Sequence, residues 1–177
     1  MTTQDLEKWN SKYLKDSGNQ SASQLLHDYI DQAPSGKALD IACGNGRNSI
    51  FLHKRGFAVD AIDISTVATK RLEALNLGIN VQCIDMDGWT VPENSYELII
   101  NIRFLDRRLF PFIERGIKPG GLLIFESFTG TKNKDFCLSP NELLHAFPML
   151  KVLHFAEKPL ESSARFEKSA SLVAMKC

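Results

Sequence analysis

The stretch Leu-Asp-Ile-Ala-Cys-Gly-Asn-Gly-Arg-Asn at residues 39–48 decides the expected fold. It begins as a short apolar run, passes through Gly44 and Gly46, and continues into a helical pattern that ends before Gly56. Glycine lets the backbone turn sharply and approach a ligand closely. The helix start that follows offers unpaired N–H groups to an anionic group. A strand, a glycine turn and a helix in this order predict a nucleotide-type binding loop.

The rest of the chain alternates between strand and helix patterns. Such alternation predicts a doubly wound, mostly parallel sheet with helices on both faces. The last two apolar runs, 151–155 and 171–175, have no helix between them, so we expect an antiparallel hairpin at one edge. The fold class is therefore α/β with a seven-stranded, Rossmann-like sheet. The expected strands cover residues 37–42, 57–62, 80–84, 96–102, 122–126, 151–155 and 171–175, and a helix is expected at 105–115.

The length of 177 residues fits one domain over residues 1–177. Leu6, Trp9 and Tyr13 recur at helical spacing, and a second helical pattern ends near Pro34. We therefore expect a helical arm over residues 1–33 and a sheet core over residues 37–177. The oligomeric state stays open.

Composition excludes several classes of protein. The 21 basic residues balance 21 acidic residues, whereas nucleic-acid binding needs a basic surplus. No apolar run is long enough to cross a membrane, and the polar start is unlike a signal peptide. The cysteines form no CxxC pair, so neither a disulfide framework nor a metal site is expected. Cys43 and Cys83 are predicted to be buried thiols, and the expected location is the cytoplasm.

Two aspartates indicate which ligand the glycine loop binds. Asp63 ends the second expected strand, seventeen residues after Gly46, where a carboxylate can accept both hydroxyls of a ribose. The alternative role of Asp63 is a solvated cap on the next helix. Asp40 stands where a pyrophosphate would lie, and a carboxylate is unfavourable beside phosphates. It suits a ligand with an ammonium and a sulfonium, such as S-adenosylmethionine (SAM).

The segment from Ala38 to Ser65 resembles the first two motifs of class I SAM-dependent methyltransferases. The run 119–124, Pro-Gly-Gly-Leu-Leu-Ile, resembles the turn before their fifth strand. The chain is most similar to the small tellurite-resistance (TehB-like) type and its bacterial relatives. The shared features are Cys-Gly-x-Gly-Arg-Asn at 43–48, Trp-x-x-x-Tyr at 9–13 and the segment 104–111.

The resemblance implies a cofactor site for SAM. Asp40 would organise its amino end, and Ile64 would lie against the adenine. Asp85 would meet the adenine amino group together with the Met86 backbone N–H, although the register leaves Asp87 open. The implied cofactor residues are Tyr13, Asp40, Ala42, Gly44, Gly46, Asp63, Ile64, Asp85, Met86 and Asn101.

Three of these positions need comment. Ala42 departs from the commonest motif, which has glycine there. Asn101 would face the methyl-donor region with its backbone. Tyr13 either packs the arm against the sheet domain or covers the cofactor, as the arm does in the look-alikes.

The acceptor side is less determined by the sequence. Arg103 and Arg47 are candidates for holding an anionic acceptor, whereas Arg107 and Arg108 are expected on a solvated helix face. No histidine lies in a motif, so no catalytic base is assigned. The expected function is methyl transfer from SAM to a small molecule, such as an oxyanion, thiol or carboxylate. The alternatives are a nucleotide-binding oxidoreductase and a non-catalytic SAM-binding module.

Overall fold

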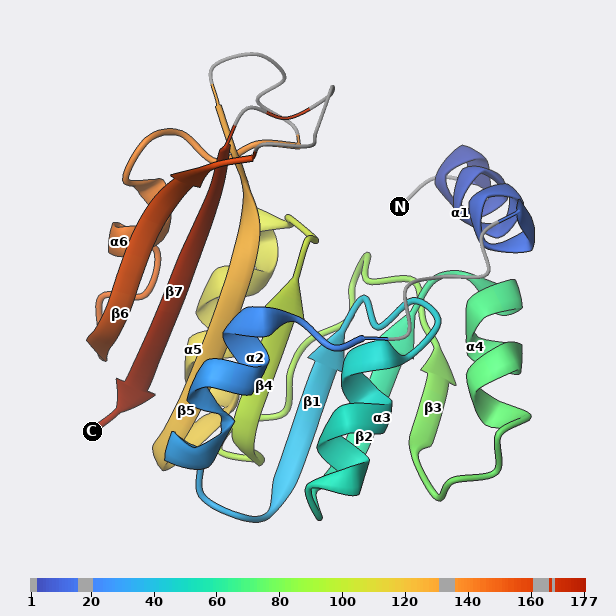
Figure 1. The fold of residues 1–177 in the computed structure, drawn as a ribbon, viewed down its shortest axis with the longest axis horizontal. Coiled ribbons are helices and arrows are strands. Elements are labelled where there is room, and N and C mark those ends of the chain that lie inside the picture. The colour runs from blue at the N-terminus through green and yellow to red at the C-terminus, as the bar shows by residue number, and fades with distance from the viewer. Residues whose placement is uncertain (1–2, 16–20, 131–135, 161–165, 167) are drawn as a thin grey trace.

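The computed structural model describes residues 3–15, 21–130, 136–160, 166 and 168–177 (Figure 1). Its seven-stranded sheet has the order β3-β2-β1-β4-β5-β7-β6. The first five strands are parallel, and β7 is antiparallel to both β5 and β6. The expected α/β fold with its antiparallel C-terminal hairpin is confirmed. The strands are β1 (Lys37–Ile41), β2 (Ala58–Asp63), β3 (Asn80–Cys83), β4 (Tyr96–Ile102), β5 (Ile117–Thr129), β6 (Leu150–Pro159) and β7 (Lys168–Lys176).

Helices cover both faces of the sheet, as expected. Leu26, Leu52 and Leu72 bring α2 (Gln24–Tyr29), α3 (Arg47–Lys54) and α4 (Thr66–Glu73) into one apolar cluster. Ile113 and Leu143 bring α5 (Phe110–Gly116) and α6 (Glu142–His145) into the other. Figure 1 shows α2 and α3 in front of the sheet and α5 behind it. Strand residues alternate between the two clusters, because successive side chains of a strand point to opposite faces.

Two expected boundaries were wrong. Strand β5 begins at Ile117, well before residue 122, so the run at 119–121 that was expected to form a turn before the strand lies inside it. Gly120 has a φ of 78°, and the pairing with β4 shifts between Tyr96 and Leu98, so the turn is a bulge in a continuing strand. The expected helix at 105–115 divides into a 3₁₀ turn, η2 (Arg107–Leu109), and α5.

The N-terminal helix α1 (Thr3–Lys15) lies beside α4, away from the sheet (Figure 1). None of its residues is buried. After it come α2 and the 3₁₀ turn η1 (Ile30–Gln32). The arm expected at 1–33 also includes residues 1–2 and 16–20, which lie outside the described residues. Within the described ranges, no helix is both long and apolar enough to span a membrane.

The cysteines divide between the core and the surface. Cys43 is buried after β1, as expected. Cys83 is exposed, so the expectation of a buried thiol was wrong there. The reason is topological: β3 is an edge strand with no neighbour on its outer side.

Candidate active site

The carboxyl ends of β1 and β4 lie side by side at the centre of the sheet, with Ile41 opposite Asn101. The strand order reverses between them, since β2 and β3 lie on one side and β5 on the other. In open α/β sheets, ligands bind outside the strand ends at such a point. The structure therefore gathers Asp40, Gly44 and Asn101 at the position expected for a ligand.

The loop after β1 turns where glycine geometry requires it. The Gly46 N–H donates to the Cys43 carbonyl at 3.0 Å, and Gly44 and Gly46 have φ values of 56° and 80°. A methyl group on Gly44 would lie 2.5 Å from Tyr13 Oη, and one on Gly46 would lie 2.4 Å from Leu72 Cδ1. Both positions therefore favour glycine, because each φ is left-handed and the side chain of Tyr13 or Leu72 would have to move aside for a larger residue.

Backbone strain gathers at the same strand ends. Ala42, at the motif position where glycine is common, adopts a φ of 56°, and Arg103 after β4 adopts 64°. Among the described residues with positive φ, these are the ones that are neither glycine nor asparagine. The left-handed conformation costs such a residue about 1–2 kcal/mol. Strain of this kind is concentrated at functional sites.

The Asp63 carboxylate holds the glycine loop in place. Its Oδ2 accepts the Gly44 N–H at 2.8 Å, and its Oδ1 accepts the Ser65 N–H at 2.8 Å. Burial raises the pKa of Asp63, although these backbone donors oppose the rise. A carboxylate has about four lone-pair sites, so Asp63 has acceptor capacity for ribose hydroxyls in addition to these two bonds.

Asp40 is a buried carboxylate with an unusual environment. Its side chain is 1% exposed, and its Oδ2 accepts the Ser49 hydroxyl at 2.6 Å. Burial raises the pKa of Asp40 to about 7, against the opposing effects of Ser49 and the positive charge of Arg47. A buried anion gains most from a cationic ligand. The bond from Ser49 joins the helix after the glycine loop to β1 and emerges only from the fold.

The arm docks on the site mainly through polar contacts. Asn10 Oδ1 accepts the Ser65 hydroxyl at 2.7 Å and the Val67 N–H at 3.3 Å, at the start of α4. Trp9 and Tyr13 stack with their ring centroids 6.0 Å apart, and neither ring is buried. The arm therefore covers Gly44 without joining the apolar core. Asn10 carried no signal in the sequence, because its partners are more than fifty residues away.

The expected adenine side combines two buried apolar residues with two exposed acids. Ile64 and Met86 are 8% and 3% exposed. Asp85 Oδ1 accepts the Asp87 N–H at 2.9 Å, which lowers the pKa of Asp85. Asp87 Oδ1 in turn accepts a bond from Arg108 at 2.6 Å. Both acids have partners in this structure, so the choice between Asp85 and Asp87 stays open.

A charged group lies on the acceptor side. Arg103 Nε pairs with Glu126 Oε1 at 3.3 Å, and Arg47 donates to the Ser21 carbonyl at 3.3 Å. Burial lowers the pKa of Arg47, and the positive charge of Arg103 lowers it further. The negative charges of Glu126 and Asp40 oppose this effect, so the two arginines and these carboxylates form one charged group.

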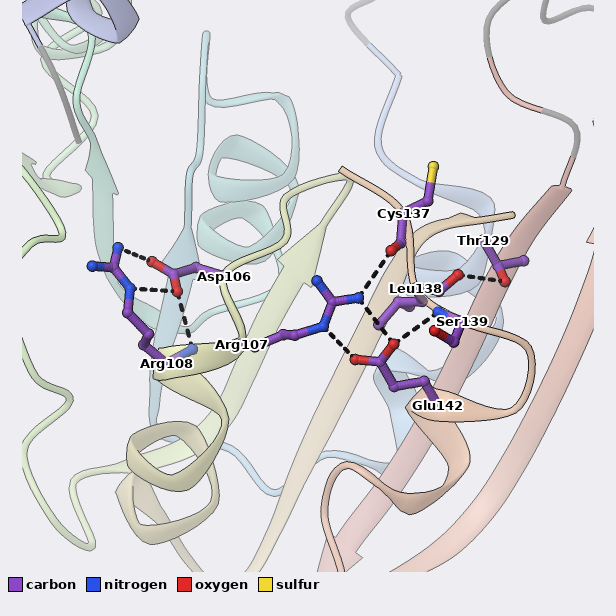
Figure 2. Close-up of polar contacts among 8 residues, drawn as sticks. All are labelled: Asp106, Arg107, Arg108, Thr129, Cys137, Leu138, Ser139 and Glu142. Carbon is purple, nitrogen blue, oxygen red and sulfur yellow. Dashed lines mark hydrogen bonds and ion pairs between the residues drawn. The ribbon is translucent and has the colours of Figure 1, made fainter. Parts of the chain in front are cut away.

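Arg107 and Arg108 are exposed on η2, as expected of a solvated helix face, and they also tie the adjacent segments together. Figure 2 shows Arg107 and Arg108 extending from η2 in opposite directions. Arg107 Nη2 donates to Glu142 Oε2 and to the Cys137 carbonyl, both at 2.9 Å. Arg108 pairs with Asp106 Oδ2 at 2.7 Å and with Asp87. The segments after β3, β4 and β5 are thereby connected, and the distance of Glu142 along the chain hid this from the sequence.

Comparison with known proteins agrees with this geometry. The methyltransferase-domain family matches residues 38–121. A ubiquinone biosynthesis O-methyltransferase from Coxiella burnetii is 32% identical over 120 residues, which cover 61% of this chain and 50% of that protein. A probable SAM-dependent methyltransferase, TehB from Haemophilus influenzae, is 33% identical over 89 residues, or 46% of this chain and 31% of TehB. The chain thus spans about half the length, or less, of these curated relatives.

Solved structures share the fold over nearly the whole chain. The crystal structure of Haemophilus influenzae TehB superposes with a TM-score of 0.76 at 20% identity, covering 96% of this chain and 67% of that one. A TehB-like SAM-dependent methyltransferase from Corynebacterium glutamicum gives 0.72 at 19% identity, covering 99% and 100%. At these identities the likeness establishes the fold.

Residues 38–121 thus match a methyltransferase domain, and the fold is the one shared by solved SAM-dependent methyltransferases. The likeness to TehB, in sequence over part of the chain and in fold over most of it, agrees with the resemblance noted in the sequence. SAM is the cofactor of this class, and the described residues fit it. Asp40 offers a buried anion for the ammonium group, and the glycine loop turns beside it at a φ of 56° for Gly44.

Proposed function

We propose that the protein transfers a methyl group from SAM to a small-molecule acceptor. The observation that carries the proposal is Asp40, a buried carboxylate beside a glycine loop that Asp63 holds in place. A pyrophosphate beside a buried carboxylate would be unfavourable, which argues against a dinucleotide-dependent oxidoreductase. A module kept only for protein contacts would have no need of a strained, ligand-shaped loop.

Each predicted residue has a proposed role in cofactor binding. Asp40 orients the ammonium group, Gly44 and Gly46 form the loop, and Asp63 accepts the ribose hydroxyls. Ile64 and Met86 enclose the adenine, with Asp85 at its amino group. Ala42 and Asn101 border the methionine part with their backbones, and Tyr13 covers it as part of a lid formed by the 1–33 arm on the 37–177 core. We propose residues 1–177 as one methyltransferase domain.

Bound SAM supplies a methyl group that is already activated by its sulfonium. The chain then has to align the acceptor with that methyl group and exclude water, and alignment alone can supply much of the rate. No base is assigned. The four histidines lie on α2, α3, α6 and β6, outside the strand-end site.

The acceptor is proposed to be a small molecule bearing an oxygen or sulfur nucleophile. Arg103 and Arg47 support an acceptor with an anionic group, such as an oxyanion, thiolate or carboxylate. The named relatives include an O-methyltransferase, which agrees with an oxygen acceptor. The free thiols, Cys43 among them, support a reducing location such as the cytoplasm.

Calorimetric titration with S-adenosylhomocysteine (SAH), alongside NAD, tests the proposal. We expect SAH to bind and NAD not to bind. Binding of NAD alone would support an oxidoreductase, and binding of neither would contradict the cofactor assignment. The role of Asp63 is tested with 2′-deoxy-SAH, because Asp63→Ala also loosens the Gly44 loop. The wild type should prefer SAH over its deoxy analogue by about 1–2 kcal/mol, and Asp63→Ala should lose this preference.

A further inference from the structure

Asn101 is a buried asparagine whose side chain has no hydrogen-bond partner within the described ranges. It is 0% exposed, and both Oδ1 and Nδ2 are unpaired there. Asn48 offers a direct contrast, since it is 5% exposed and its Oδ1 accepts the Ser23 N–H at 2.9 Å. Burying a carboxamide without partners is costly, and nearly all buried polar groups in proteins are paired. An unpaired buried amide therefore points to a ligand.

The position of Asn101 indicates which part of the site that ligand occupies. Asn101 is opposite Ile41 on β1 and Phe125 on β5. Alternation along β4 places its side chain on the same face as Ile99, whereas Ile100, opposite Asp40, is on the other face. The Asn101 amide is therefore on the far side of the sheet from Asp40. Two strands, β2 and β1, also separate it from β3, where the adenine is expected.

The surroundings of Asn101 are apolar. Ile41 and Phe125 both belong to the cluster formed with α5 and α6. Phe104 and Leu105, which follow β4 after Arg103, are partly buried and pack against that cluster. A ligand group that reaches Asn101 would therefore be surrounded by apolar side chains on several sides.

We propose that the Asn101 carboxamide binds the methyl acceptor, and that the acceptor is a largely apolar molecule bearing a hydroxyl beside a second oxygen. A carboxamide presents an acceptor oxygen next to a donor nitrogen. Both are satisfied by a partner with a hydroxyl donor next to an oxygen acceptor. In transfer, the acceptor oxygen gains the methyl group as the methyl–sulfur bond breaks, and it releases its proton to water. This inference rests on the proposed methyltransferase function and names its substrate class.

The test compares Asn101→Leu with Asn48→Leu. Leucine removes the unpaired amide at Asn101, so the urea midpoint of that variant should stay unchanged or rise. Asn48→Leu leaves the Ser23 N–H unpaired, so its midpoint should fall. The proposed cofactor contact of Asn101 is made by its backbone, which leucine keeps, so SAH affinity in Asn101→Leu should stay within twofold of the wild type. A fall in the Asn101→Leu midpoint equal to that of Asn48→Leu, or a tenfold loss of SAH affinity, would overturn the proposal in favour of a structural or cofactor role.

Acceptor binding is measured with 1,2-dihydroxybenzene as the probe, in the presence of SAH. The side-chain amide resonances of Asn101 should shift on addition of the probe, and Asn101→Leu should bind it at least tenfold more weakly. Cyclohexane, which is apolar but has no oxygen, serves as the control and should not shift those resonances. Absence of a shift with saturating dihydroxybenzene would sink the proposal. Failure of the wild type to bind SAH would instead contradict the methyltransferase function itself.

Discussion

Each end of the sheet buries a carboxylate, and the surroundings shift its pKa in opposite directions at the two ends. At the amino end, Asp60 Oδ2 accepts the Tyr96 hydroxyl at 2.7 Å and pairs with Lys37 Nζ at 2.8 Å, while Oδ1 accepts Asn80 Nδ2 at 2.8 Å. Burial raises the pKa of Asp60, but these partners outweigh it, and the pKa falls below its ordinary value. At the carboxyl end, Asp40 depends on Ser49, and its pKa rises to about 7.

Backbone strain and an unpaired side-chain amide are also found at the carboxyl end of the sheet. Ala42 and Arg103, the strained residues, end β1 and β4, and Asn101 carries its unpaired amide beside them. The amino end is thus built for stability, because its buried groups are satisfied within the fold. The carboxyl end keeps unsatisfied groups at a cost in stability, which is expected of a surface that a ligand completes.

The largest expected effect at the carboxyl end comes from Gly44→Val. The side chain would collide with Tyr13 and force a strained backbone at a φ of 56°. SAH affinity should fall by about a hundredfold or more, corresponding to roughly 3 kcal/mol. Calorimetry measures this, and Gly120→Val is the control, because no atom lies within 4 Å of a side chain built there. Wild-type affinity in Gly44→Val would mean that the loop is not part of the site.

At the amino end, Asp60→Ala should lower the free energy of unfolding by about 2–3 kcal/mol, because it leaves the buried Tyr96 hydroxyl unpaired. Urea denaturation measures the loss. The SAH affinity of the folded variant should equal that of the wild type. If Asp60→Ala weakened SAH binding as strongly as it destabilised the fold, the two ends would not be functionally separate.

The raised pKa of Asp40 predicts that SAH binding depends on pH. Ionised Asp40 attracts the ammonium group, so affinity should fall as the pH drops below about 7, by about tenfold from pH 8 to pH 6. Asp40→Asn should bind weakly at both pH values. The free energy of unfolding of Asp40→Asn at pH 8 should also exceed that of the wild type. Asp40 stabilises the fold most when it is protonated, below about pH 4, and this stabilisation is lost as the pH rises through about 7. A pH-independent wild type would contradict this role.

The smallest expected effect is that of Ala42→Gly. Glycine relieves the left-handed strain at Ala42 but loses more conformational entropy on folding, so a net stabilisation of about 0.5 kcal/mol is expected. Thermal denaturation measures it, with Ala38→Gly in the regular part of β1 as a control that should be destabilised. Destabilisation in both variants would show that Ala42 is not strained.

The sequence predicted the parallel core and the C-terminal hairpin, since both follow from local apolar patterns. It misplaced the start of β5, because Pro119 and Gly120 are typical of a turn and only the pairing with β4 shows a bulge. It also missed the bonds of Arg107 to Glu142, which lies 35 residues away. A charged side chain in a polar segment gives no local sign of such a partner.

By itself, the sequence determined the class of fold and the SAM-type loop, because strand period, glycine turns and helix starts depend on neighbouring residues. Only the tertiary structure decided how each site residue is held. Asp63 reaches the Gly44 N–H, Tyr13 covers Gly44, and Asn101 is buried without a partner through contacts between segments distant in sequence. The pKa of Asp40 likewise depends on burial, which no local pattern specifies.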